Sequence, residues 1–268
     1  MATVDLVVTD LDGTLWSGDA DTHPATVAAW QELERRGVPV LVATGRRLTS
    51  TREPLARLGF APPAVMMNGA LAIDLGTNER FHSWHYDAED AIAVLAAFRA
   101  AGVEPCVYVD HYRVDVFFGD RPATHPDHLA AFGATAERAD LEEIVSSVPV
   151  MMFGIMGHPV DPFPALATSV TETAQPHLAP SDQYGGHSFT VTPAGLSKWT
   201  GVEAYCTRAG LDPTRVLAIG DGPNDRELLA GAAIAVAPVD ASDEARRDAD
   251  YFVGSPREGG WAEILDLI

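Results

Sequence analysis

The chain has 268 residues, of which 47% are hydrophobic and 21% are charged, a composition typical of a globular protein with a full core. Its formal net charge of -20 argues against nucleic acids and anionic membrane surfaces as partners, because both need a basic face on the protein. Cys106 and Cys206 lie far apart and give neither a disulfide framework nor zinc-site spacing. Since no secretory signal or membrane-spanning stretch is evident, we expect a cytoplasmic protein.

The first part of the chain alternates apolar strands with helices. Residues 6–8 form a short apolar run of the kind expected for a strand buried on both faces. A helix is predicted between Pro24 and Gly37, where capping residues precede apolar residues at helical spacing. Further buried strands are predicted at 38–43 and 65–67, with a helix between them. This order indicates a parallel βαβαβ sheet.

After residue 76 the pattern changes to a mixed α+β one. The expected elements are an extended connection over 81–86, a helix over 88–101, a hairpin of 107–109 with 114–117, a helical stretch near 128, a strand over 150–156, a helix over 163–173 and a strand pair around 178 and 189–191. We therefore expect residues 83–191 to form an inserted domain, with residues 1–82 and 192–268 together forming the core.

The βα alternation returns after this region. The expected elements are a helix over 197–209, a strand over 216–219, a Gly-rich acidic loop over 220–225 followed by a helix, strands over 234–236 and 251–253, and a closing helix over 261–268. The predicted class is α/β, with a parallel-sheet core and an inserted α+β domain.

Two aspartates, Asp10 and Asp12, follow the first strand, where open α/β sheets bind their ligands. Two carboxylates near a phosphate repel it and each other by about 4 kcal/mol per pair at roughly 4 Å and an effective dielectric constant near 20, so a cation is required. Mg²⁺ is suited to the site because it prefers oxygen ligands. One aspartate is then able to attack phosphorus while the other moves protons. The alternative is an Asp-rich turn that only ends the strand.

A second strand runs into an acidic turn at Asp221, Asn224 and Asp225. Asp221 lies at the strand end, where it would complete a metal site. Asn224 and Asp225 would cap the following helix and also face the loop, and pure capping is the alternative for both.

Two further places would suit an anion. Thr44 and Gly45 end the second strand and offer a hydroxyl and an amide to phosphate oxygens, although an ordinary strand-to-helix turn is the alternative. Lys198 lies near a helix start, where its charge opposes the helix dipole. A nearby anion would explain this lysine, and a solvated surface lysine is the alternative.

The chain carries five motifs, in this order: Asp10-Leu11-Asp12-Gly13-Thr14, Thr44-Gly45-Arg46, Asn68-Gly69-Ala70, Gly195-Leu196-Ser197-Lys198 and Gly220-Asp221-Gly222-Pro223-Asn224-Asp225. Together they resemble the motifs of the haloacid dehalogenase (HAD) superfamily, and most closely its Cof-type phosphatase branch. The resemblance implies a Rossmann-like core with a large inserted α/β cap.

The resemblance also implies roles for these residues. Asp10 would be the nucleophile and Asp12 the general acid and base. Mg²⁺ would be held by Asp10, the main-chain carbonyl of Asp12 and Asp221, with support from Asp225. The phosphoryl group would be bound by the residues Thr44, Gly45, Lys198 and Asn224.

The predicted function is a Mg²⁺-dependent phosphatase that hydrolyses a small phosphate monoester, such as a sugar phosphate or a phosphorylated cofactor, through a phosphoaspartate intermediate. One alternative is a phosphomutase or phosphotransferase on the same scaffold. Another is a phospho-acceptor or binding protein without turnover. A monomer or a weak dimer is expected.

Overall fold

A computed structural model of the chain describes residues 4–18, 20–111, 113–181 and 183–268. The chain divides into two compact units, one of Met1–Ser83 with Ser197–Ile268 and the other of Trp84–Leu196. The second unit is thus inserted in the sequence of the first. Its end lies beyond the predicted residue 191, because the strand β11 (His187–Pro193) pairs with its neighbour along its whole length inside this unit.

The first unit contains one sheet of eight strands. Their order is β14-β13-β12-β1-β2-β3-β4-β5, parallel from β14 to β3 and antiparallel at β4 and β5. The strands are β1 (Leu6–Thr9), β2 (Val40–Ala43), β3 (Pro63–Met66), β4 (Leu71–Asp74), β5 (Arg80–Ser83), β12 (Val216–Ile219), β13 (Ile234–Pro238) and β14 (Tyr251–Val253). The helices are α1 (Pro24–Arg36), α2 (Leu48–Arg57), α7 (Lys198–Ala209), α8 (Arg226–Gly231) and α9 (Asp243–Asp248). Short 3-10 helices are η1 (Met67–Gly69), η3 (Pro213–Arg215), η4 (Pro223–Asp225), η5 (Pro256–Glu258) and η6 (Gly260–Leu267).

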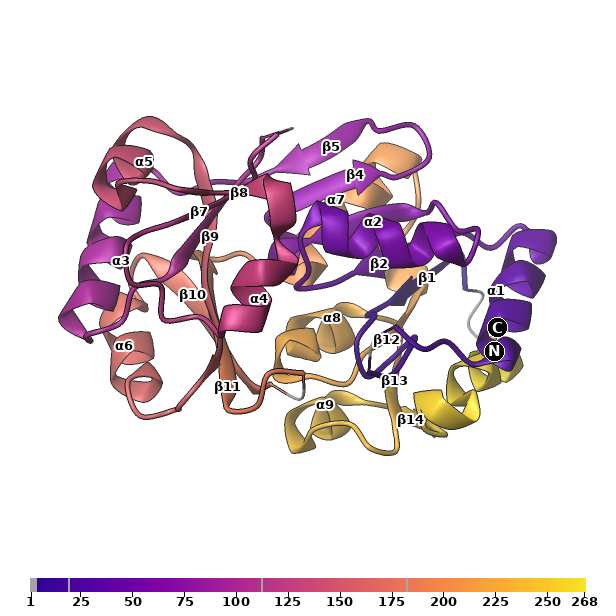
Figure 1. Ribbon diagram of the computed structural model, residues 1–268. Helices are drawn as coiled ribbons and strands as arrows, with labels where there is room; N and C mark the ends of the chain where they lie inside the picture. The colour runs from indigo at the N-terminus through magenta and orange to yellow at the C-terminus, as the bar shows by residue number, and fades with distance from the viewer. Residues whose placement is uncertain (1–3, 19, 112, 182) are drawn as a thin grey trace. The chain divides into compact units, whose positions relative to one another are not determined.

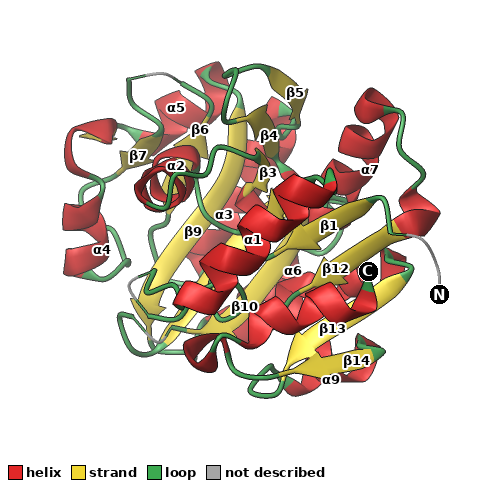
Figure 2. Ribbon diagram, turned by 90° about the vertical axis from the view of Figure 1, so that its right-hand side faces the viewer, coloured by secondary structure: helices red, strands yellow, loops and turns green. Residues whose placement is uncertain are grey.

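Both faces of this sheet are covered, which explains why its central strands are apolar throughout. Leu6 and Val8 of β1 pack with Val202 of α7 and Leu228 of α8 in one buried cluster. Figure 2 shows α1 lying across the sheet. On β1, Thr9 accepts a hydrogen bond from Trp261 of η6 at 3.0 Å. Side chains alternate between the two faces of a strand, and since both faces are covered here, every residue of β1 is buried.

The second unit contains a sheet of six strands in the order β10-β11-β9-β6-β7-β8, antiparallel except where β7 meets β8. In addition to β11, the strands are β6 (Cys106–Val109), β7 (Val116–Phe118), β8 (Ala136–Arg138), β9 (Val150–His158) and β10 (Ala174–Pro180). The helices are α3 (Ala88–Ala100), α4 (Pro126–Ala131), α5 (Leu141–Ser147) and α6 (Phe163–Val170), with the 3-10 helix η2 (Gly133–Thr135). Figure 1 shows α3, α5 and α6 on one face of this sheet.

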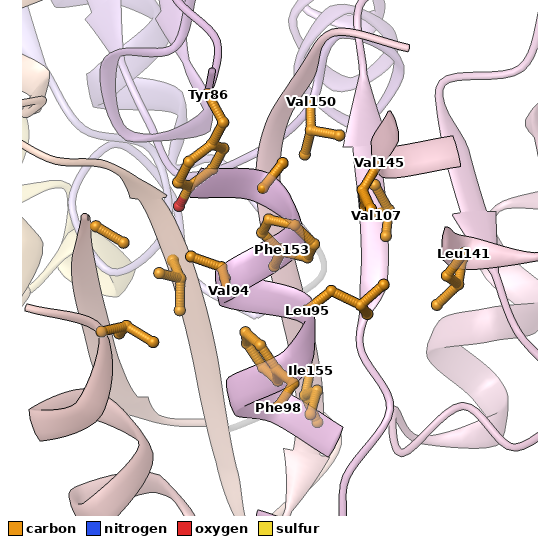
Figure 3. Close-up of a cluster of buried hydrophobic side chains, with 14 of the residues drawn as sticks. Tyr86, Val94, Leu95, Phe98, Val107, Leu141, Val145, Val150, Phe153 and Ile155 are labelled. Carbon is orange, nitrogen blue, oxygen red and sulfur yellow. The ribbon is translucent and has the colours of Figure 1, made fainter. Parts of the chain in front are cut away.

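The core of the second unit lies between that sheet and those helices. Phe98 of α3 is fully buried and stacks against Phe153 of β9, and its ring also lies 5.8 Å from that of Phe189. Figure 3 shows these apolar side chains around Phe153, with Leu141 and others contributed by neighbouring elements. This unit therefore has a hydrophobic core of its own.

The predicted α/β class with an inserted α+β domain is confirmed, and several local predictions need correction. Residues 81–83 of the expected extended connection over 81–86 belong to the edge strand β5, which pairs with β4. The turn between them is closed by Asp74, whose Oδ1 accepts from Gly76 N and Thr77 N. The closing helix is a 3-10 helix. The hairpin of β6 and β7 is present, although Tyr112 in its connection lies outside the described residues. Across the described chain, the helices all fall short of the length and hydropathy that crossing a bilayer requires.

Candidate active site

Neighbouring parallel strands bring two acidic loops of the first unit together. β1 and β12 pair with Thr9 opposite Ile219, and Asp10 N donates to Ile219 O at 2.9 Å. Asp10 therefore leaves β1 at the same edge of the sheet at which residues 220–225 leave β12. Open α/β sheets bind ligands at this edge.

Three carboxylates converge at this edge. One oxygen from each of Asp10, Asp221 and Asp225 lies within 4.8 Å of the others. Asp10 is 6% exposed and Asp225 is fully buried. Hard oxygen donors at this density fit Mg²⁺, and burying so much negative charge requires a compensating cation.

Lys198, the only lysine in the sequence, lies among these carboxylates. It is the first residue of α7 and follows the N-cap residue Ser197. The Lys198 Nζ lies 2.9 Å from Asp10 Oδ1 and 2.7 Å from Asp225 Oδ1. Because the side chain is buried, the alternative of a solvated surface lysine is wrong. One ammonium facing three carboxylates still leaves an excess of negative charge.

The pKa values at the cluster reflect burial and the crowding of like charges. Burial raises the pKa of Asp10 to about 7, although the Lys198 ammonium acts against this shift. Burial and the charge of Asp10 raise the pKa of Asp221 well above its usual range. Burial alone would lower the pKa of Lys198, but Asp10 and Asp225 together raise it, so the ammonium stays charged. Without a further cation, Asp10 and Asp221 therefore resist full ionisation at neutral pH.

This shift predicts a pH dependence of stability in the metal-free protein. In the unfolded chain Asp10 loses its proton near its ordinary pKa of 3.8, whereas the folded protein keeps that proton up to about pH 7. Between these values the folded state binds more protons, so raising the pH lowers the free energy of unfolding. In urea unfolding with EDTA, wild type should lose stability relative to Asp10→Asn as the pH rises from about 4 to about 7. Parallel pH profiles for the two proteins would contradict the raised pKa.

Asp225 organises the loop that carries Asp221. Its Oδ2 accepts hydrogen bonds from Asp221 N at 3.1 Å and from Gly222 N at 2.9 Å. A Cβ at Gly220 would overlap the Asp225 side chain, so this close approach requires glycine. These bonds close the turn η4, but at the start of α8 the side chain of Asp225 makes no capping bond, so the predicted capping of that helix is wrong for Asp225. The other oxygen of Asp225 faces Lys198.

Thr14 is a contact of the cluster that sequence analysis missed. Its Oγ1 donates to Asp221 Oδ1 at 2.7 Å and thereby links the loop after β1 to the loop after β12. Gly13 has a φ of +75°, and a Cβ there would overlap the Asp221 carboxylate. The Gly13-Thr14 pair directly after the two aspartates marked Thr14 as a possible site residue. Its partner is more than 200 residues away, and no local sequence pattern identifies it.

The remaining predicted phosphate-binding residues lie where the loops after β2 and β12 meet the loop after β3. Asn224 Nδ2 donates to Asn68 Oδ1 at 2.9 Å, and a Cβ on Gly45 would lie 3.1 Å from that oxygen. Thr44 is 1% exposed, and its Oγ1 accepts from Arg46 N at 3.2 Å. Asn68 is therefore a further candidate residue. Its φ of +52°, in the left-handed region that asparagine tolerates, turns the chain directly after β3.

The carboxylate of Asp12 is not one of the three that cluster. The side chain is 49% exposed and accepts hydrogen bonds from Arg46 and Trp16. The predicted metal contact through its main-chain carbonyl stays a prediction. Sequence analysis did not assign Arg46 to Asp12, because these residues are 34 positions apart and become neighbours only through the pairing of β1 with β2. Trp16 was also missed, although it lies only four positions after Asp12.

The chain matches the family model of haloacid dehalogenase-like hydrolases over residues 7–265. A curated relative from Methanopyrus kandleri, named phosphoglycolate phosphatase, is 28% identical over 261 residues, which are 97% of this chain and 95% of the relative.

Two solved structures share the fold. A phosphatase of the HAD superfamily from Bacteroides thetaiotaomicron has a TM-score of 0.81 at 19% identity and covers 99% of this chain and 95% of its own. A sugar phosphatase of HAD subclass IIB has a TM-score of 0.79 at 21% identity, with 98% of each chain covered. The family model spans nearly the whole chain, and the predicted resemblance is confirmed. The chain therefore belongs to the haloacid dehalogenase-like hydrolases and is an enzyme of their phosphatase type.

Proposed function

We propose that the protein is a Mg²⁺-dependent phosphatase that hydrolyses a small phosphate monoester through a phosphoaspartate on Asp10. The observation that carries this proposal is the buried cluster of Asp10, Asp221 and Asp225 around the Lys198 ammonium. A structural ion pair would not need three carboxylates for one cation. The family membership supports the same chemistry.

The residues present fit a magnesium ion. Asp10, Asp221 and Asp225 would hold it, and their excess of negative charge over Lys198 is the feature that requires it. When bound, the ion would neutralise charge on the phosphoryl oxygens and on the carboxylates.

The first step is carried by Asp10 and Asp12. A carboxylate oxygen of Asp10 forms a bond to phosphorus while the bond from phosphorus to the ester oxygen breaks, and Asp12 gives its proton to that leaving oxygen. Lys198, 2.9 Å from Asp10, fixes the orientation of the nucleophile and adds positive charge beside the transferring group. In the second step, water attacks the phosphoaspartate.

The phosphoryl oxygens would be bound where the loop of Gly45, after β2, meets Asn224 of η4. Gly45 lacks the side chain that would fill the space beside Asn68 and Asn224, and Thr44 precedes it at the end of β2. Backbone amides in such a turn bind anions without adding a charged side chain.

The substrate we propose is a small phosphorylated metabolite. Relatives of this chain are named phosphoglycolate phosphatase and sugar phosphatase, so phosphoglycolate and sugar phosphates belong in the first substrate panel. A protein with a net charge of -20 gains no long-range attraction for such anions, so binding depends on cations at the site.

Metal removal tests the proposed function. We expect phosphate release from at least one ester in Mg²⁺ and none in EDTA, because the carboxylate cluster repels an anionic ester unless a cation is bound. Mg²⁺ at about 100 times its dissociation constant should also stabilise the fold by about 2.7 kcal/mol. The measurements are a phosphate-release assay and thermal unfolding with each addition. Equal turnover in EDTA would rule out the metal-dependent reaction.

A further inference from the structure

Asp12 is held by a rigid pair of side chains from the first unit. Arg46 Nε donates to Asp12 Oδ2 and Arg46 Nη2 donates to Asp12 Oδ1, each at 2.6 Å. Trp16 Nε1 donates to the same Oδ1 at 3.0 Å. The guanidinium thus binds both oxygens in a fork, and the indole fixes which way the carboxylate faces.

Arg46 is itself held on several sides. Its Nη1 donates to Ser50 O at 2.9 Å, and its guanidinium carbon lies 5.3 Å from the centre of the Trp16 ring. Its backbone oxygen accepts from Met67 N at 3.0 Å. Trp16 is fully buried. A flexible surface ion pair has none of these anchors, so the position of Asp12 is built into the loop after β1 and the start of α2.

The hydrogen bonds fix the orientation of the Asp12 carboxylate. All three donors point at it, and both of its oxygens accept from Arg46. We propose that Arg46 and Trp16 are positioning residues that hold Asp12 in the orientation from which it receives a proton of the water that hydrolyses the phosphoaspartate. This inference rests on the proposed function.

This proton transfer belongs to the hydrolysis of the phosphoaspartate. The water oxygen forms a bond to phosphorus, the bond from phosphorus to the Asp10 oxygen breaks, and its electron pair stays on Asp10. The water proton goes to Asp12. Inorganic phosphate leaves, and Asp12 then carries the proton that it gives to the next leaving oxygen.

Arg46→Lys separates fork geometry from positive charge, because an ammonium is a point charge without the planar fork. The substrate is p-nitrophenyl phosphate, whose leaving group needs little protonation, so kcat/KM reports the first step with little demand on Asp12. We expect kcat to fall by about 10²-fold, the usual cost of a misplaced catalytic group, while kcat/KM changes little. Nitrophenol should then appear in a burst, with Asp10 accumulating in its phosphorylated form.

Further variants keep the test independent of folding. Trp16→Phe removes one hydrogen bond and should shift kcat in the same direction by less. Adding Arg46→Lys to Asp12→Asn should have no further effect on kcat, because the residue it positions is already gone. Arg52→Lys is the matched control, since Arg52 lies in α2, the helix that follows Arg46, and bonds to Asn78. Its kinetics should equal those of wild type.

The kinetics of Arg46→Lys separate positioning from substrate binding. If the change raises KM and lowers kcat/KM, Arg46 binds substrate and the positioning role is overturned. If kcat falls without accumulation of phosphorylated Asp10, the role in the second step is likewise overturned. If wild type neither hydrolyses a phosphate ester nor forms a phosphoaspartate, the proposed function itself has failed, and the Arg46 variants are not needed to show it.

Discussion

Asp10→Asn should abolish phosphate release while leaving the protein folded. The change removes the nucleophilic oxygen with almost no change in shape, and losses of about 10⁵- to 10⁶-fold in kcat are seen when a covalent nucleophile is removed. Folding should persist because the substitution also removes one of three crowded carboxylates. The measurement is kcat in saturating Mg²⁺, together with the unfolding transition.

A matched control is available at the other end of the same strand. Asp5 lies just before β1, at the end opposite Asp10, and pairs with Arg215 at 2.7 Å. Asp5→Asn should therefore turn over like wild type. If Asp10→Asn retained more than about a hundredth of wild-type activity, well above the residue left when a nucleophile is lost, Asp10 would not be the nucleophile.

Lys198→Met should destabilise the metal-free protein strongly and slow catalysis. Its removal leaves Asp10 and Asp225 buried without their ammonium, and breaking a buried pair in this way costs about 3–5 kcal/mol. Turnover should fall by about 10²- to 10³-fold, as when one electrostatic stabiliser is removed from an active site. Urea unfolding with EDTA and with Mg²⁺ measures the first effect, and Mg²⁺ should recover part of the lost stability.

Arg208→Met provides the comparison within the same helix. Arg208 pairs with Glu79 at 2.6 Å on the surface, where the side chains are 42% and 57% exposed. Its loss should cost no more than about 1 kcal/mol, since exposed ion pairs contribute little. A Lys198→Met protein that unfolds at the same urea concentration as Arg208→Met would show that the buried charges are not compensated by Lys198.

The parallel strands of the first unit were predictable because burial on both faces leaves a plain apolar run. Val216–Ile219 is an example, and its predicted bounds match β12. The short edge strand β5 was not predictable in this way. Its residues Arg80 and Ser83 are exposed, so apolar periodicity carries no signal there, and the strand is defined by its hydrogen bonds to β4.

The candidate site, too, was predictable only where local sequence patterns carry a signal. Asp10 and Asp221 could be placed at one edge because parallel strands end together. The burial of Lys198 could not be predicted, since a lysine at a helix start is ordinarily solvated. The Arg46 fork on Asp12 depends on strand pairing between β1 and β2, which local spacing does not specify.

The covalent intermediate is the most direct test of this account. Asp12→Asn would be mixed with p-nitrophenyl phosphate and Mg²⁺, quenched in acid within one turnover and digested for mass spectrometry. We expect one phosphoryl group on Asp10, in the peptide that contains β1, and none when Asp10→Asn is added to the same protein. Release of free phosphate with this peptide unmodified, or a phosphoryl group on another residue, would contradict catalysis through Asp10.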